Sequence, residues 1–516
     1  MVTSVTEPVG IIAREYQRKI ADSALEANTL VVLPTGLGKT LVAFLVAVER
    51  LSRFPEGKVL MLAPTRPLVL QHGRFFKDHL VEPVATAVLT GEVQPETRRA
   101  LFDESRLVFA TPEVIRNDIL EQRYSLQNVC LVVFDEAHRC VRDYAYSEVA
   151  GAYKREASNP LILGLTASPS ARKSRVEEIC EKLAITNVET RIEADADVSP
   201  YVKQVALNWV RVPLPPGYKQ ISKVLRGALE EKIERLRLMR QLPARVPVSK
   251  RILLELGERL RARIRRGGPG TLYGAVMLQA QAMSLMHSIE LLETQGIHNL
   301  DRSLARLSVA SSKSARGLSK DPRILEARKL SSSLADGEHP KLSQLRELVA
   351  EDLRQNKASK IIVFTQFRDT VETIVISLNR LEGVSAVRFV GQATRSEENP
   401  GLSQTEQMQI LEQFRQGEYN VLVTTSIGEE GLHVPDVDHV IFYEAVPSEI
   451  RTIQRRGRTG RTRPGKMTVL IAEGTIDEAY YWTSRRKEEQ MHRFLETVKR
   501  NGVKRGKRKT TLLDYA

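Results

Sequence analysis

Two groups of short apolar segments constrain the fold of this chain more than any other feature. The first group alternates with helical patterns, and its members end in polar or turn-forming residues: LVVL (30–33), VLMLAP (59–64), LVFATP (107–112), LVVFDEAH (131–138) and LILGLTASP (161–169). Such runs are typical of buried parallel strands with ligand-facing loops at their carboxyl ends. The pattern returns in KIIVFTQF (360–367), AVRFVG (386–391), YNVLVTTS (419–426), HVIFYE (439–444) and KMTVLIA (466–472). The sequence therefore predicts two α/β domains, each built on a doubly wound parallel sheet.

The segment between the two groups has a different character. After one alternating run, VALNWVRV (205–212), it is predominantly helical with basic faces. One helical stripe consists of four apolar residues, Ile252, Leu256, Leu260 and Ile264. The segment RRGGPG (265–270) is expected to end that helix. SSKSARGLSKDP (311–322) and SSSLADGEHP (331–340) are typical of loops. We expect a helical insertion domain at 201–340, flanked by α/β domains at 1–200 and 341–495 and followed by a basic tail at 496–516.

The charge of the chain is concentrated in two places. The 516 residues carry a net charge of +14, with 42% hydrophobic and 27% charged residues, which is ordinary for a soluble globular protein. Residues 201–340 hold 25 Lys and Arg against 12 Asp and Glu, and residues 485–509 hold 11 against 3. Two basic zones favour a polyanionic partner, although charge alone also fits two solvated faces.

Cysteine usage and hydropathy restrict the compartment. The three cysteines, Cys130, Cys140 and Cys180, form no C-x-x-C pair and are too few for a disulfide framework. The chain has no apolar run long enough to span a membrane, and its first residues lack the layout of a signal peptide. We therefore expect a cytoplasmic protein without a membrane partner.

The strand LVVL leads directly into PTGLGKT (34–40), and a helical pattern follows. This order is the context of a phosphate loop, in which glycines let backbone N–H groups approach the phosphates. Lys39 would reach the β- and γ-phosphates, and the Thr40 hydroxyl would bind Mg²⁺. The strict pattern has a glycine where this chain has Leu33. The residues predicted to bind the nucleotide here are Thr35, Gly36, Gly38, Lys39 and Thr40.

DEAH (135–138) lies at the end of an apolar strand, where a Walker-B carboxylate belongs. Asp135 is predicted to hold Mg²⁺, and Glu136 to orient and deprotonate the attacking water. His138 has no partner histidine for a metal, so a contact between domains is expected for it. A solvated strand end is the alternative, and the phosphate loop upstream disfavours it.

The segment QRRGRTGR (454–461) places four arginines within eight residues. Arginines this close in the sequence repel each other unless a bound anionic ligand neutralises their charge. Arg458 and Arg461, one helical turn apart, suit a γ-phosphate bound by the other domain, and Gln454 opens the segment. Hydrolysis would then require the two α/β domains to close on each other. A basic surface loop is the alternative.

In this order the motifs resemble those of a superfamily 2 helicase core, and within it the archaeal Hef helicases and their FANCM relatives. The resemblance runs from about residue 14 to 485 and includes REYQ (14–17), PTGLGKT, APTRPLV (63–69), TG (90–91), TPEV (111–114), DEAHR (135–139), LTASP (165–169), VFTQFRDT (363–370), FVGQ (389–392), TTSIGEEGLHVPDVD (424–438) and IQRRGRTGR (453–461). It implies two RecA-like domains around a helical insertion. The implied activity is an ATP-dependent, Mg²⁺-dependent DNA helicase or translocase, moving 3′ to 5′ on branched or single-stranded DNA in repair and restart of replication forks.

The resemblance also implies roles for individual residues. Gln17 would read the adenine of ATP, and Gly431 and His433 would lie at the nucleotide. Seven positions would track the nucleic acid strand: Thr65, Arg66, Gly91, Thr111, Thr365, Gln366 and Thr424. Thr166 and Ser168 would couple hydrolysis to domain motion. Because the family commonly has an aspartate at the position of His433, we expect weaker or altered nucleotide affinity.

The insertion falls where Hef-like proteins carry a helical domain implicated in gripping branched DNA. Its few aromatic residues favour contact with duplex phosphates over base stacking. Arg259, Arg263 and Arg266 are the candidates for this contact. Many Hef proteins continue into an XPF-type nuclease, whose motif this chain lacks, so we expect no nuclease activity.

The last residues, KRGKRKTTLLDYA (504–516), resemble a clamp-binding peptide, with Leu512 and Tyr515 three positions apart. They predict binding to the sliding clamp PCNA, and a basic tail that holds DNA is the alternative. Two other functions stay open for the whole chain. One is a duplex-RNA-activated ATPase of the Dicer and RIG-I-like group, and the other is a non-catalytic DNA clamp, which intact catalytic motifs disfavour.

Overall fold

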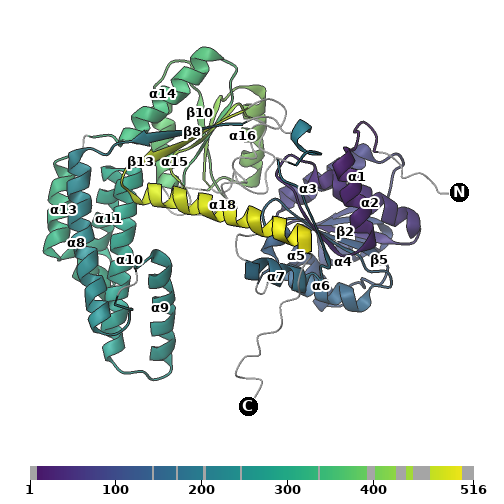
Figure 1. Ribbon diagram of the computed structural model, residues 1–516, viewed down its shortest axis with the longest axis horizontal. Coiled ribbons are helices and arrows are strands. Elements are labelled where there is room, and N and C mark those ends of the chain that lie inside the picture. Colours follow the sequence, from purple (N-terminus) through teal and green to yellow (C-terminus); the bar gives the residue numbers. More distant parts are fainter. Residues whose placement is uncertain are drawn as a thin grey trace.

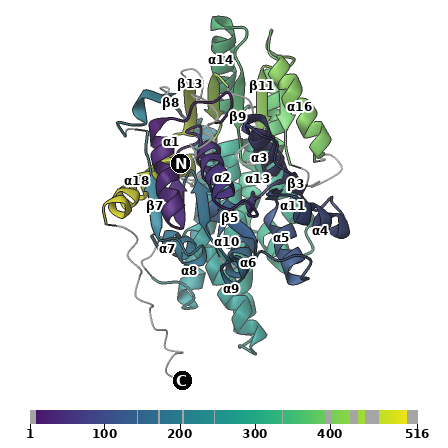
Figure 2. The same ribbon diagram turned by 90° about the vertical axis from the view of Figure 1, so that its right-hand side faces the viewer.

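The computed structural model describes residues 8–141, 144–169, 173–193, 195–201, 205–244, 247–334, 337–391, 401–425, 437–445 and 465–501. These residues form two parallel sheets with their helices, a helical bundle and one long helix that runs between them (Figure 1). In Figure 1 the first α/β domain lies at the right, the second at the upper left and the bundle at the lower left. Figure 2 looks from the side of the first domain, with α14 and α16 of the second domain at the top and α9 of the bundle at the bottom.

The first sheet has the strand order β3-β4-β2-β5-β6-β1-β7, and all neighbouring strands are parallel. Its strands are β1 (Thr29–Val32), β2 (Lys58–Leu62), β3 (Thr86–Leu89), β4 (Leu107–Ala110), β5 (Val129–Phe134), β6 (Ile162–Thr166) and β7 (Asn187–Thr190). The five apolar runs predicted in this half form the five interior strands. The edge strands β3 and β7 are partly exposed, and neither is among the runs predicted from the sequence.

Alternate strand residues point to opposite faces of this sheet, and helices cover both. Leu30 and Val32 belong to one hydrophobic core, and Val31 between them belongs to the other. One face packs against α1 (Glu15–Glu26), α2 (Lys39–Arg53) and α3 (Arg66–His79), and the other against α4 (Pro95–Glu104), α5 (Pro112–Leu120), α6 (Ala145–Glu156) and α7 (Lys173–Lys182). Because the strands are parallel, the loops after β1, β2, β4, β5 and β6 gather at one edge of the sheet.

The second sheet has the order β10-β11-β9-β12-β13-β8 and is also entirely parallel. Its strands are β8 (Val205–Val212), β9 (Ile361–Phe364), β10 (Ala386–Phe389), β11 (Val421–Thr424), β12 (His439–Phe442) and β13 (Gly465–Ala472). The helices in the described part of this domain are α14 (Pro340–Gln355), α15 (Arg368–Leu378), α16 (Gln404–Gln416) and α18 (Ile476–Asn501). The five runs predicted here are strands β9 to β13, so the two-domain α/β architecture is confirmed.

Strand β8 corrects one boundary of the predicted domains. The sequence places residues 205–212 in the insertion, but β8 pairs with β13 over its whole length, from Val205 opposite Gly465 to Val212 opposite Ala472. It is the exposed edge strand of the second sheet, and its partner is distant in the sequence. Neither fact can be read from local alternation. The bundle itself therefore begins only after β8.

The bundle consists of six helices: α8 (Pro216–Leu238), α9 (Lys250–Arg265), α10 (Thr271–Gln295), α11 (Ile297–Val309), α12 (Lys313–Ser319) and α13 (Pro322–Ser332). The predicted break between α9 and α10 is confirmed. Helix α12 lies where a loop is predicted. Its start is fixed by Ser312, whose hydroxyl accepts from the N–H of Ala315, and Ala315 and Leu318 are buried beneath it. A serine-rich stretch can thus be helical when a serine caps it and small apolar residues pack.

Helix α18 is the longest element and crosses from the second domain to the first (Figure 1). In its second half, Met491 is buried in the core of the first domain, where the Ser168 hydroxyl donates to its sulfur over 3.0 Å. Although α10 and α18 have 25 and 26 residues, no helix in the described ranges is long and apolar enough to cross a membrane.

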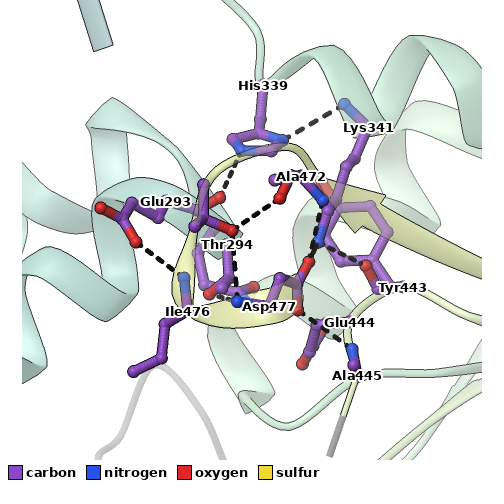
Figure 3. Close-up of polar contacts among 12 residues, drawn as sticks. Glu293, Thr294, His339, Lys341, Tyr443, Glu444, Ala445, Ala472, Ile476 and Asp477 are labelled. Carbon is purple, nitrogen blue, oxygen red and sulfur yellow. Dashed lines mark hydrogen bonds and ion pairs between the residues drawn. The ribbon is translucent and has the colours of Figure 1, made fainter. Parts of the chain in front are cut away.

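A buried polar cluster joins the bundle to the second domain (Figure 3). Lys341, at the start of α14, forms an ion pair with Asp477 at the start of α18, and neither side chain is exposed. The Asp477 carboxylate also accepts from the N–H groups of Ala445 and Ala472, at 3.0 and 3.2 Å. From the bundle, Glu293 accepts from the N–H of Ile476 over 3.1 Å. The ends of β12, β13 and α10 are therefore fixed to the same point.

Candidate nucleotide and nucleic-acid site

The segment between β1 and α2 has the backbone geometry of a phosphate loop. Gly36 and Gly38 have φ angles of +87° and +81°, in the left-handed region that glycine adopts readily. A Cβ at Gly38 would lie 2.3 Å from Nε2 of Gln17, so no side chain fits there. Helix α2 begins at Lys39, directly after the loop, so its first N–H groups and the positive end of its dipole are available to an anion.

The predicted phosphate ligands surround this loop. Lys39 Nζ donates to the Leu33 carbonyl over 3.0 Å, so the ammonium lies folded over the loop. Thr35 is half-buried in the loop, and Thr40 is half-buried in the first turn of α2. An ammonium, a hydroxyl and backbone N–H groups at one helix N-terminus together form a cradle suited to a polyphosphate.

Gln17 packs against the phosphate loop from α1. Its Nε2 donates to the Leu37 carbonyl over 3.0 Å, and its Oε1 accepts from the N–H of Arg14 over 2.9 Å. The Tyr16 hydroxyl donates to the same Leu37 carbonyl over 2.8 Å. Both ends of the Gln17 amide are thus engaged within the protein. Because the amide has two N–H donors and two acceptor lone pairs, these contacts do not exhaust it, and the contact with adenine stays a prediction.

Asp135 and Glu136 follow β5 at the same edge of the sheet. Asp135 is 6% exposed, and its main-chain carbonyl accepts from the Tyr146 hydroxyl over 2.7 Å. Its Oδ2 lies 2.8 Å from Nε2 of His72. Glu136 has a φ of +49°, a left-handed conformation that is uncommon for a residue with a side chain. Such backbone geometry is frequent at functional sites, and here it turns the chain sharply after the strand.

The predicted coupling residues form a chain of contacts that starts at Glu136. His138 Nδ1 is 3.1 Å from the Glu136 carboxylate and 3.2 Å from the Thr166 hydroxyl. Thr166 in turn accepts from the N–H of Ser168 over 3.2 Å. The sequence predicts a contact between domains for His138, but the contacts described here lie within the first domain. They connect the end of β5 to the end of β6, and through Ser168 to Met491 of α18.

The charge state of Glu136 follows from these neighbours. Burial acts to raise its pKa, but the hydrogen bond and charge of His138 and the positive charges of Lys39 and Arg139 outweigh it and lower the pKa to about 2. Glu136 is therefore ionised at neutral pH and able to accept a hydrogen bond or proton from water.

The first-domain residues predicted to track a nucleic acid strand all lie at loops or helix N-termini on the carboxyl edge of the sheet: Thr65, Arg66, Gly91 and Thr111. Arg66 forms an ion pair with Glu92 and also donates to Oε1 of Gln404, in the second domain, over 3.0 Å. A Cβ added at Gly91 would meet nothing within 4 Å. This edge therefore offers one cation that bridges the two domains.

In the second domain the three predicted strand-tracking residues follow β9 and end β11: Thr365, Gln366 and Thr424. Thr365 and Thr424 are fully buried. Thr365 donates to Oε1 of Glu444 over 2.9 Å, and Thr424 donates to the Thr425 carbonyl over 3.1 Å. The Gln366 amide donates to the Ala445 carbonyl over 3.1 Å. In this structure all three side chains fix the loops rather than present hydroxyl or amide groups outward.

The predicted duplex-binding arginines lie on α9 or, for Arg266, directly after its last residue, at the far end of the bundle (Figure 2). Arg259, Arg263 and Arg266 are exposed. Arg259 donates to the main-chain carbonyl of Gln241 over 2.8 Å, and Arg263 donates to the Gln241 side chain over 3.4 Å. The loop after α8 thus holds two of these cations on one side of α9.

Several predicted residues lie outside the described part of the chain, and their roles stay predictions. They are the nucleotide-site residues Gly431 and His433, the segment residues Gln454, Arg458 and Arg461, and the clamp-binding residues Leu512 and Tyr515.

Two residues of the site were missed from the sequence, His72 and Tyr146. His72 lies on the buried face of α3, in register with Val69 and Phe76. A polar residue in an otherwise apolar stripe was the available signal. Tyr146 gave no such signal, because a tyrosine in the core of a helix is common and its partner carbonyl is not readable from the sequence.

Comparison with known proteins places this arrangement in a family. Residues 14–176 match the family of DEAD/DEAH box helicases, residues 340–463 match the helicase conserved C-terminal domain, and residues 217–334 match the helical bundle of a putative ATP-dependent RNA helicase. The crystal structure of the Pyrococcus furiosus Hef helicase domain is 45% identical, with a TM-score of 0.70, and covers 92% of this chain and 98% of that chain. The chain belongs to the Hef and FANCM type of superfamily 2 helicases. The predicted pair of RecA-like domains around a helical insertion is confirmed for this Hef-type chain.

Relatives of this Hef-type chain carry different names. A putative ATP-dependent RNA helicase of Methanocaldococcus jannaschii is 42% identical over 493 residues, which are 95% of this chain and 62% of that protein. The Fanconi anemia group M protein homolog of Mus musculus is 32% identical over 514 residues, which are 92% of this chain and 25% of that protein. The Hef-type chain thus spans less than two thirds of the length of these relatives.

The oxygen donors of the site fit a magnesium ion that is completed by a nucleotide. Mg²⁺ is usually held by one or two protein oxygens together with substrate phosphates and water. Thr40 supplies a hydroxyl, and Asp135 supplies a carboxylate whose described contacts use Oδ2 alone. Within the described ranges no group of three or more His, Cys, Asp and Glu residues could hold a metal by itself. Thr40 and Asp135 would hold such an ion together with the phosphates of the nucleotide.

Proposed function

We propose that this chain is an ATP-dependent DNA helicase or translocase that remodels or unwinds branched DNA, such as a replication fork, during repair and restart. The expected direction is 3′ to 5′. In this proposal the first domain, at 1–200, binds ATP and Mg²⁺. The helical bundle that follows β8 grips branched DNA, and the second domain, which comprises β8 and the residues from 341 to 495, completes the ATP site with its arginines.

One observation carries the proposal. The phosphate loop, the Asp135–Glu136 strand end and the Thr166–Ser168 segment meet at one edge of the first sheet, with Glu136 within reach of His138 and near Lys39. This is the constellation that phosphoryl transfer to water requires: a phosphate cradle, a metal-binding carboxylate and an ionised base.

Each residue then has a defined part in ATP hydrolysis. The N–H groups at the start of α2 and the Lys39 ammonium bind the β- and γ-phosphates, and Thr40 and Asp135 hold Mg²⁺. The bound metal would neutralise charge on the phosphates. Glu136, ionised at neutral pH, accepts a proton from the attacking water and orients it towards the γ-phosphorus.

Hydrolysis is coupled to movement by closure of the two RecA-like domains. Arg458 and Arg461, with Gln454, are proposed to reach the γ-phosphate from the second domain and to stabilise its charge. His138 and Thr166 connect Glu136 to Ser168, which contacts Met491 of α18. Loss of the γ-phosphate would therefore change the contact between Ser168 and Met491, where α18 joins the first domain. Alternating closure and opening would shift the grip on one strand.

A duplex-RNA-activated ATPase is the second candidate. Two observations favour it: the M. jannaschii relative is named a putative RNA helicase, and the bundle matches a family described in the same terms. The DNA assignment is supported instead by the relatives named as ATP-dependent DNA helicases, such as that of Neurospora crassa, which is 32% identical over 485 residues.

ATPase stimulation distinguishes the two candidates. The full chain is incubated with ATP and Mg²⁺ alone, and then with single-stranded DNA, forked DNA, four-way DNA junctions or duplex RNA at equal nucleotide concentration. We expect the largest stimulation with forked or four-way DNA. Stimulation by duplex RNA and none by branched DNA would establish the alternative.

The proposal also covers the C-terminal tail, at 496–516, and the cellular location of the protein. We propose that Leu512 and Tyr515 bind the sliding clamp PCNA, which would hold the enzyme at forks, and that the protein works in the cytoplasm of an archaeal cell. A peptide of residues 501–516 should bind PCNA in solution, and replacing both Leu512 and Tyr515 by alanine should remove the binding while DNA-stimulated ATPase persists.

A further inference from the structure

His72 is a buried imidazole on α3, the helix that follows β2. It is 3% exposed and shares the buried face of the helix with Val69 and Phe76. A histidine in such a stripe is ordinarily a core residue with both ring nitrogens hydrogen-bonded. Here Nε2 lies 2.8 Å from Oδ2 of Asp135, and Nδ1 is buried without a hydrogen-bond partner among the described residues. The polar contact of this ring is therefore directed at the predicted metal ligand.

The direction of this hydrogen bond follows from its chemistry. An ionised carboxylate only accepts, so Nε2 carries the proton and donates to Oδ2. The main-chain carbonyl of Asp135 is held separately by Tyr146, which leaves the carboxylate orientation to His72. The described contacts of the carboxylate use Oδ2, so Oδ1 stays available to a further ligand. Groups that orient metal ligands in this way raise metal affinity without touching the metal.

The same helix reaches the predicted nucleic-acid site. Helix α3 begins at Arg66, which contacts Glu92 and, across the domain interface, Gln404. Six residues separate Arg66 from His72, which is about 9 Å along a helix axis. A helix segment this short moves as a rigid body, so a shift of its N-terminus on strand binding or domain closure also moves the imidazole. Movement of the imidazole would in turn move the Asp135 carboxylate to which it is hydrogen-bonded.

We propose that His72 is a positioning residue for Asp135, and that α3 uses it to couple the strand-binding end of the helix to the metal site. The proposal rests on the proposed function only in that Asp135 is the Mg²⁺ ligand. It assigns no chemical step to His72. The imidazole holds Oδ2, and DNA bound at the start of α3 would stabilise the orientation in which the Asp135 carboxylate can hold the metal.

The test compares two substitutions of similar volume in the full chain, His72→Leu and His72→Gln. Leucine removes the donor, whereas the glutamine amide reaches about as far as Nε2 and restores it. Binding of a fluorescent, non-hydrolysable ATP analogue is titrated with Mg²⁺. Because loss of such an orienting hydrogen bond typically costs about 10- to 100-fold in metal affinity, His72→Leu should raise the half-saturating Mg²⁺ concentration at least about tenfold. His72→Gln should stay close to the unsubstituted chain.

Two controls separate positioning from a structural role. Tyr153→Phe removes two other buried hydrogen bonds of the first domain, which the Tyr153 hydroxyl donates to the Leu161 carbonyl and accepts from the Leu161 N–H, and should leave the Mg²⁺ titration unchanged. Binding of the analogue in EDTA should be equal in all variants. If His72→Leu does not fold, His72→Asn, whose amide is too short to reach Oδ2, takes its place with the same expectation.

The coupling has its own measurement. Saturating forked DNA should lower the half-saturating Mg²⁺ concentration of the unsubstituted chain at least about fivefold, a usual size for coupling between two sites, and leave that of His72→Leu unchanged. An unchanged Mg²⁺ titration in His72→Leu, or equal defects in the leucine and glutamine variants, would overturn the proposal. Asp135→Asn identifies the cause: if it also leaves the Mg²⁺ titration unchanged, the metal assignment of the proposed function has failed.

Discussion

His339 is the residue of the bundle junction whose response to pH can be worked out from the structure. It is 4% exposed and caps α14 (Figure 3). Its Nδ1 accepts from the N–H of Lys341 and its Nε2–H donates to the Glu293 carbonyl, both over 3.2 Å. Burial and the nearby charge of Lys341 lower its pKa from 6.5 to about 3, although the hydrogen bond to Glu293 acts in the opposite direction. A neutral imidazole is therefore built into the junction.

The sign of the pH effect follows. A histidine whose pKa is lower in the folded state contributes stability that is present above pH 6.5 and is lost as the pH falls towards about 3. At pH 5 the loss is about 2 kcal/mol, since each pH unit below 6.5 costs about 1.4 kcal/mol. The loss should appear as easier opening of the junction between α10 and α14, because the charged ring would have no acceptor for its Nδ1–H.

The assay is hydrogen exchange of the full chain at pH 7.5 and 5.0, read as opening free energies for residues 289–301 and 340–355. His339→Asn keeps a good helix cap but does not titrate. Between pH 7.5 and 5.0 its opening free energy should therefore fall by about 2 kcal/mol less than that of the unsubstituted chain. His439, whose pKa is also lowered by burial, is present in the unsubstituted chain and in His339→Asn, so its contribution cancels when the two pH responses are subtracted. His298→Gln, an exposed position, is the matched control. An identical pH response in His339→Asn and the unsubstituted chain would refute the reasoning.

Three further predictions follow from the structure. Lys341→Met leaves the buried Asp477 carboxylate without its counter-charge and should destabilise the second domain by about 3–5 kcal/mol in denaturant unfolding, whereas Arg354→Met, at the exposed ion pair with Glu351 on the same helix α14, should cost less than about 1 kcal/mol. Equal losses would show that burial of the pair does not matter. Replacing Arg259, Arg263 and Arg266 by glutamine should weaken the salt dependence of binding. If each arginine contacts one phosphate, the negative slope of log affinity for forked DNA against log salt becomes less steep by about 2.7. The same substitutions at the exposed Arg354, Arg380 and Arg415 of the second domain change the net charge equally and should leave the slope unchanged. His433→Asp should tighten ATP binding in equilibrium titrations, and unchanged or weaker binding would remove this position from the nucleotide site.

The interior of both sheets could be predicted because buried parallel strands must be continuously apolar. That requirement weakens at the edges. Strands β3 (TAVL) and β7 (NVET) are partly exposed, and the search for long apolar runs did not find them. β8 was visible as a strand but not as a member of the second sheet, because its partner β13 lies far away in the sequence. Local patterns fix the type of an element more readily than its neighbours.

The candidate site divides in the same way. Lys39, Asp135 and Glu136 were found because phosphate and metal chemistry restricts residue type and spacing. The residues that hold them, such as His72 and Tyr146, come from helices α3 and α6, and any donor of suitable length could serve there. Thr365 shows the converse. Its motif was recognised, but its hydroxyl is buried against Glu444, a contact that only the folded sheet creates.

The central claim is that Glu136 is the base of an ATPase that branched DNA stimulates. It is tested most directly by measuring ATP turnover and fork binding for the unsubstituted chain and for Glu136→Gln, which keeps the size of the side chain but removes the proton acceptor. We predict that forked DNA stimulates turnover of the unsubstituted chain, and that Glu136→Gln abolishes this turnover while it still binds ATP and forked DNA. Normal DNA-stimulated turnover by Glu136→Gln would contradict the account.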